Sequence, residues 1–202
     1  MSEPLARLRA LLERSFGAVP RETTPEAYVQ RLCRELDACF AELLDREAPV
    51  PFDELTALAD EYRDRGRTLP ASVERAHFDW LTREKGWYKV VAGPDGRPRA
   101  PELPAGAPSA PLTLAPRLYE RVAELRYELH RRAHPGPCDC AALIAGGRLR
   151  EPRSPELRPL GPATDGYYFG DTFLCGACGA RWFRGVGDDA RGTTFWEPSR
   201  DS

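Results

Sequence analysis

The sequence predicts an α+β fold in which a mainly helical N-terminal region is followed by a small β-rich C-terminal module. Apolar residues recur at helical spacing through the first 86 residues, whereas short β-branched and aromatic runs surround two close pairs of cysteines in the last third. A proline-rich stretch lies between these two patterns and belongs to neither of them. With 202 residues, the chain is long enough to bury a hydrophobic core, as one large domain or two small ones.

The composition is that of a soluble globular protein, with 42% hydrophobic and 30% charged residues. The net charge of −2 provides no global basic field that would attract nucleic acid. No apolar run is long enough to cross a membrane, and the N-terminus lacks the apolar core and cleavage site of a signal peptide. We therefore expect a cytoplasmic protein without a membrane partner, in which close thiol pairs hold metal more often than they form disulfides.

The first two predicted helices each carry one apolar stripe. In the first helix the stripe comprises Leu5, Leu8, Leu11, Leu12 and Phe16. The second helix opens at Thr24, whose side chain suits an N-cap, and Pro25 suits the first helical turn. Its stripe comprises Val29, Leu32, Cys33, Leu36, Phe40, Leu43 and Leu44.

A third helix is predicted over 52–65 and a fourth over about 71–85, and each is followed by a glycine that can end it. The run at 87–92 is β-branched and aromatic, and a turn signal at 93–96 follows it. A short strand or hairpin is therefore expected there. The helical region covers residues 1–93 and ends in this short strand.

Residues 94–116 hold seven prolines and are expected to form a connector with polyproline character. A solvated linker explains this composition, and a ligand for a proline-recognising domain is the alternative. A long helix is predicted over 117–134, with a buried stripe formed by Leu118, Val122, Leu125 and Leu129. The cysteine module occupies residues 135–202.

Two tight pairs of cysteines carry the only clear chemical signal in the chain. Cys138 and Cys140 are separated by one residue, and Cys175 and Cys178 by two. Two such pairs supply the four tetrahedral ligands of a structural zinc ion. Gly179 directly follows the second pair, where a positive φ is expected because a tight turn must point both sulfurs at one metal.

The residues around the second pair resemble a zinc ribbon, which is a three-stranded sheet pinned at one end by metal. Apolar residues precede Cys175, the run at 180–183 follows it, and the run at 193–196 provides a third strand. The resemblance covers residues 134–198 and implies a fold rather than an activity. The small core of this ribbon is expected from the aromatic residues Tyr167, Phe169, Trp182 and Trp196.

Alternatives remain for the ligand set and for the chemistry. A ribbon normally uses two C-x-x-C pairs, so His134 stands as a substitute for one thiol, and an absence of metal or a redox role is also considered. A catalytic zinc needs an open coordination position, which four thiolates do not leave. Cys33 and Cys39 lie on different faces of one predicted helix and are expected to be buried small hydrophobes.

The sequence shows no phosphate-binding loop, dinucleotide-binding motif or serine hydrolase motif. We therefore expect a non-enzymatic, zinc-binding bacterial accessory or regulatory protein that acts through protein–protein contacts, immunity- or antitoxin-like at class level. A nucleic-acid-associated regulator is the first alternative, because Arg181, Arg184 and Arg191 are interleaved with tryptophans. A zinc-dependent enzyme that uses His134 is the second alternative.

Overall fold

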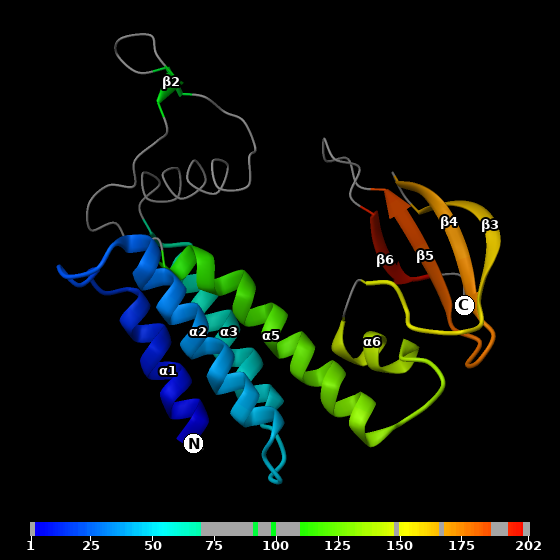
Figure 1. Ribbon diagram of the computed structural model, residues 1–202, viewed down its shortest axis with the longest axis horizontal. Helices are drawn as coiled ribbons and strands as arrows, with labels where there is room; N and C mark the ends of the chain where they lie inside the picture. The colour runs from blue at the N-terminus through cyan, green and yellow to red at the C-terminus, as the bar shows by residue number, and fades with distance from the viewer. Residues whose placement is uncertain are drawn as a thin grey trace. The chain divides into compact units, whose positions relative to one another are not determined.

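A computed structural model describes residues 3–69, 91–92, 98–99, 110–147, 150–165, 168–186 and 194–199 of the protein. The chain divides into two compact units, Met1–Arg121 and Val122–Ser202, and the boundary lies inside one long helix. Helices form the described part of the first unit, apart from one short hairpin, and a four-stranded antiparallel sheet dominates the second (Figure 1). The predicted α+β fold class is therefore confirmed.

The first unit contains helices α1 (Glu3–Ser15), α2 (Pro25–Leu44) and α3 (Phe52–Gly66), together with the start of α5 (Ala110–Ala133). The predicted apolar stripes of α1 and α2 are mostly buried, as shown by Leu8 and Leu32, whereas Phe16, Cys33 and Leu44 are half-buried. Thr24 caps α2 as predicted, because its hydroxyl accepts a hydrogen bond from the Ala27 N–H at 3.2 Å.

Charged side chains connect the helices of the first unit across its surface. Arg7 on α1 pairs with Glu42 on α2 at 2.8 Å, and Arg65 on α3 pairs with Glu13 on α1 at 2.7 Å. Arg117 on α5 pairs with Asp37 on α2. These pairs place α1 against both α2 and α3, and α5 against α2.

Helix α5 begins at Ala110, earlier than the predicted start near Pro116. Residues 110–116 therefore belong to the helix rather than to the connector predicted over 94–116. The early start is physically reasonable because Pro111 lies in the first turn, where no N–H partner is needed. Pro116 lies inside the helix and removes one hydrogen bond, which the complete burial of Leu114 and Leu118 offsets.

Strands β1 (Val91–Ala92) and β2 (Pro98–Arg99) pair antiparallel, as expected for a short hairpin in this region. The predicted fourth helix, most of the proline-rich connector and the turn predicted at 93–96 lie outside the described residues. No helix among the described residues is long and apolar enough to cross a membrane.

The second unit contains the short helix α6 (Cys140–Gly146) and strands β3 (Leu157–Asp165), β4 (Tyr168–Cys175), β5 (Arg181–Val186) and β6 (Thr194–Pro198). The strands lie in the order β3-β4-β5-β6, and every neighbouring pair is antiparallel. Strands β4 to β6 correspond to the three predicted strands. Strand β3 is additional, so the predicted three-stranded sheet is corrected to four strands.

The two faces of this sheet carry different aromatic clusters. One face contributes Trp182 and Trp196 to a core that also contains Tyr127 and Leu143 from the helices. On the other face, the rings of Phe183 and Phe195 lie together, over two glycines of the neighbouring strands.

The four residues predicted for the ribbon core have different outcomes. Trp182 and Trp196 are buried as predicted. The prediction for Phe169 is wrong, because its side chain is 76% exposed near the end of β4 that is remote from Cys175. Tyr167 lies outside the described residues.

Candidate metal centre

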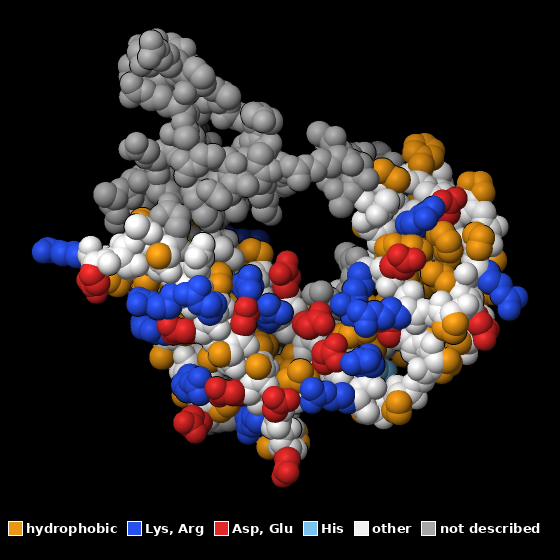
Figure 2. Space-filling model, viewed as in Figure 1, with side chains coloured by type: hydrophobic (Ala, Val, Ile, Leu, Met, Phe, Trp, Pro, Cys, Tyr) orange, Lys and Arg blue, Asp and Glu red, His pale blue; other side chains and the backbone are white. Residues whose placement is uncertain are grey.

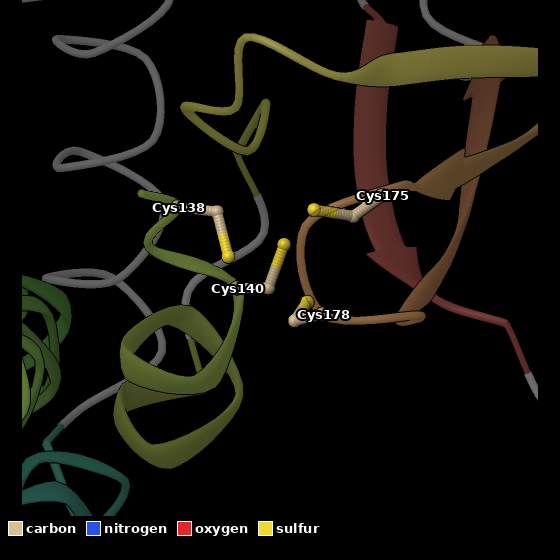
Figure 3. A group of neighbouring side chains, drawn as sticks. All are labelled: Cys138, Cys140, Cys175 and Cys178. Atoms are coloured by element: carbon tan, nitrogen blue, oxygen red, sulfur yellow. The ribbon is translucent and has the colours of Figure 1, made fainter. Parts of the chain in front are cut away.

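The structure brings the four predicted cysteines of the second unit into one group. Their sulfur atoms all lie within 4.8 Å of one another. Cys138 and Cys140 come from the start of α6 and the loop before it, whereas Cys175 and Cys178 come from the turn between β4 and β5. Figure 3 shows the four side chains converging from these two segments. The group is a candidate metal-binding site, and its small antiparallel sheet is compatible with a zinc-ribbon-like module.

The turn between β4 and β5 positions the second pair of thiols. The Cys175 carbonyl accepts a hydrogen bond from the Gly179 N–H at 2.7 Å, and the Cys175 N–H donates to the Ala180 carbonyl at 2.9 Å. Gly179 has a φ of 78°, so the positive φ predicted after the second cysteine is confirmed. Glycine reaches this conformation without the steric penalty of a side chain, and the tight turn results.

Asp139 holds the first pair, although it belongs to none of the motifs recognised in the sequence. Its carboxylate is buried and accepts two hydrogen bonds: one from the Tyr127 hydroxyl at 2.8 Å and one from the Arg153 backbone N–H at 2.6 Å. Its own backbone N–H donates to the Arg153 carbonyl at 3.2 Å. The residue between Cys138 and Cys140 thus connects their loop to helix α5 and to the segment before β3.

His134, the predicted substitute ligand, is not part of the group. It is exposed just beyond the end of α5, and its ring contacts that of His130 with 4.6 Å between the centroids. Among the described residues, the metal-capable group consists of the four cysteines alone. Cys33 and Cys39 are also free thiols, and burial raises the pKa of both. Cys39 is buried as predicted, whereas Cys33 is only half-buried.

Burial and hydrogen bonding act in opposite directions on the clustered thiols. Burial raises the pKa of Cys138 and Cys140. Burial also acts to raise the pKa of Cys175, but hydrogen bonding with Ser154 and with the backbone of Cys178 outweighs it and lowers the pKa to about 7. Of Cys138, Cys140 and Cys175, the last therefore most readily becomes the thiolate that a metal ion requires.

The donor set fits a tetrahedral ion that prefers sulfur. Sulfur ligands at about 2.3 Å from a tetrahedral ion lie about 3.8 Å apart, and the group needs only small adjustments to reach this spacing. An orphaned polar atom supports the fit, because the buried Trp182 Nε1 has no hydrogen-bond partner in the described part of the chain. Trp182 belongs to the same buried cluster as Cys140, and its N–H would be satisfied by a metal-bound thiolate there.

Comparison of the chain with protein-family models, with curated proteins and with solved structures gives no match. The chemistry of the centre is therefore interpreted from its own geometry. Four thiolates fill a tetrahedral shell and leave no position for water, so this arrangement suits structural stabilisation rather than Lewis-acid catalysis.

Proposed function

We propose that the protein is a non-enzymatic, zinc-binding accessory or regulatory protein that acts through contacts with another protein. The observation that carries the proposal is the convergence of four sulfur atoms within 4.8 Å in a group without a fifth candidate ligand among the described residues. Zinc is the ion that best matches four thiolates in tetrahedral geometry, and a closed shell of this kind stabilises a fold.

The metal site is built into the core of the second unit, which supports a structural role. Cys140 and Cys175 are both fully buried and belong to the same cluster as Trp182. A small sheet with a short helix has little apolar area to bury, and domains of this size commonly need a metal ion or disulfides. We infer that zinc binding stabilises the residues that form the contact surface.

Exposed apolar residues near one end of the sheet provide the surface for a protein partner. Phe169 is 76% exposed and Val186 is 50% exposed. Gly170 pairs with Gly185 on the neighbouring antiparallel strand; Phe169 precedes the first glycine and Val186 follows the second, so Phe169 and Val186 lie side by side. Figure 2 shows apolar side chains gathered over this sheet. Full burial of one such aromatic side chain contributes about 2 kcal/mol to an interface.

One of the three arginines that suggested nucleic acid, Arg184, makes its contacts within the sheet, and Arg191 lies outside the described residues. The Arg184 guanidinium forms an ion pair with Asp171 at 2.6 Å. It also lies over the rings of Phe173 and Trp196. Because its charge is paired and its plane is packed, this arginine favours a protein partner over a phosphate backbone. An immunity- or antitoxin-like role, in which the partner is a single target protein, fits this surface at the level of class.

Cross-linking in the source cell, followed by mass spectrometry, tests the proposed contact surface. The Phe169→Ser/Val186→Ser variant is expected to lose a partner that the wild type captures. Ile144→Ser is the matched control, because Ile144 is 51% exposed and belongs to α6 rather than to the sheet. Capture of the same partner by the double variant contradicts the proposal, as does nucleic-acid binding that falls steeply with salt.

A further inference from the structure

A zinc ion bound by four thiolates carries a net charge of −2, which must be stabilised in the interior of the second unit. The four sulfurs differ in their access to water. Cys178 is exposed and Cys138 is half-buried, whereas Cys140 and Cys175 are completely buried. Water can solvate the first two ligands, but the charge on Cys140 and Cys175 requires hydrogen-bond donors from the protein.

Two side chains can supply hydrogen-bond donors to the buried sulfurs of Cys140 and Cys175. The Ser154 hydroxyl lies 3.1 Å from the Cys175 sulfur, and it can donate to that sulfur once the thiol is ionised. The Trp182 indole nitrogen is buried in the same core cluster as Cys140 and has no hydrogen-bond partner in the described part of the chain, so its N–H is available to a Cys140 thiolate. Each completely buried sulfur therefore has one candidate side-chain donor.

We infer that Ser154 and Trp182 are positioning residues of the metal centre, which hold the thiolates of Cys175 and Cys140 by hydrogen bonds and thereby set how tightly the ion is retained. This inference rests on the proposed four-thiolate site. A donor that shares the charge of a thiolate also lowers its reactivity, so the same two residues protect the buried ligands from oxidation. Removal of such a partner typically weakens metal binding by about 10- to 100-fold.

Full-length variants that remove only the donor test the inference. Trp182→Phe keeps an aromatic ring in the core and removes the N–H, whereas Ser154→Ala removes the hydroxyl and Ser154→Thr retains it. Trp196→Phe is the matched control, because Trp196 lies in the same core cluster on the next strand. Far-ultraviolet circular dichroism establishes that each variant is folded before metal binding is compared.

Cobalt(II) serves as the probe, with affinity measured by competition against a chromophoric chelator. We expect Trp182→Phe and Ser154→Ala each to weaken binding by about 10-fold or more and to shift the sulfur-to-cobalt charge-transfer band to lower energy. Ser154→Thr and Trp196→Phe are expected to retain the wild-type band and affinity. A purely structural role would change stability without moving the band.

The outcomes separate this inference from the proposed function. If the wild type shows no four-thiolate cobalt spectrum, the proposed metal site itself is wrong. If the wild type shows that spectrum but Trp182→Phe and Ser154→Ala retain its band and bind within about twofold of its affinity, the site stands and the inference is overturned. Ser154→Ala decides the question independently if Trp182→Phe does not fold.

Discussion

Replacement of Asp139 by alanine should weaken both the second unit and its metal centre. The Asp139 carboxylate is buried and accepts hydrogen bonds from Tyr127 at 2.8 Å and from the Arg153 backbone at 2.6 Å. A hydrogen bond to a charged group contributes about 1.5–3 kcal/mol to the free energy of unfolding, and a buried donor left without a partner adds a desolvation penalty of similar size. Since removal of the carboxylate also removes its own burial cost, we expect the free energy of unfolding to fall by about 2–3 kcal/mol.

A double-mutant cycle separates the direct interaction from indirect effects. Tyr127→Phe removes one donor and keeps the ring, so the coupling energy between Tyr127 and Asp139 is expected to be about 1 kcal/mol or more. Urea unfolding is measured together with peptide-level hydrogen exchange over 138–147, which reports on the cysteine loop and α6 directly. If Asp139→Ala leaves the urea midpoint, the exchange of this segment and the metal affinity unchanged, Asp139 does not hold the first cysteine pair.

Three further outcomes follow from the packing and charge of the two units. Gly170→Ala should lower the thermal midpoint and the free energy of unfolding, the latter by about 1–3 kcal/mol, because the new Cβ would lie 2.0 Å from the Arg184 carbonyl oxygen. In the control variant Gly66→Ala, the new Cβ meets nothing within 4 Å, so this substitution should be neutral or stabilising by up to about 1 kcal/mol. At Asp37, burial raises the carboxyl pKa, but the hydrogen bonds from Arg117 and Arg121 outweigh this effect and lower the pKa below its ordinary value of 3.8. The stability that comes from this lowered pKa is present above pH 3.8 and is lost as the pH falls through the folded-state pKa. Asp37→Asn should therefore lower the free energy of unfolding by about 1 kcal/mol at pH 7 and by less at pH 3. An equal loss at both pH values in urea titrations would contradict this. Removal of metal with a strong chelator should increase hydrogen exchange throughout the β3 to β6 sheet while exchange in α1 to α3 is unchanged; protection of the sheet without metal would show that the ion does not stabilise it.

Local signals made much of the fold predictable from the sequence. The stripe from Leu5 to Leu12 gave a helix because leucines at this spacing form one face, and Thr24 marked the start of α2 because its hydroxyl accepts a backbone hydrogen bond. The spacing of the cysteine pair and Gly179 predicted the turn between β4 and β5, since both depend on residues within one short segment.

Features that depend on distant partners were not predictable in the same way. Strand β3 was missed because Pro159 and Pro162 argue against a strand; a strand on the edge of a sheet tolerates them, since one side needs no hydrogen bonds. Asp139 forms a hydrogen bond with Arg153, 14 positions away, and Ser154 forms one with Cys175, 21 positions away. Nothing in the immediate sequence of Asp139 or Ser154 therefore marks its contribution to the cysteine site. Phe169 was assigned to the core from its type alone, although only packing decides which aromatic residues are covered.

X-ray absorption at the zinc edge, combined with native mass spectrometry of the purified full-length chain, tests the four-thiolate centre most directly. We predict one zinc ion per chain with four sulfur neighbours at about 2.3 Å and no nitrogen or oxygen in the first coordination shell. Cys175→Ser should lose the ion. A nitrogen or oxygen ligand in the wild-type shell, or a stably folded second unit that binds no metal, would contradict the closed structural site formed by Cys138, Cys140, Cys175 and Cys178.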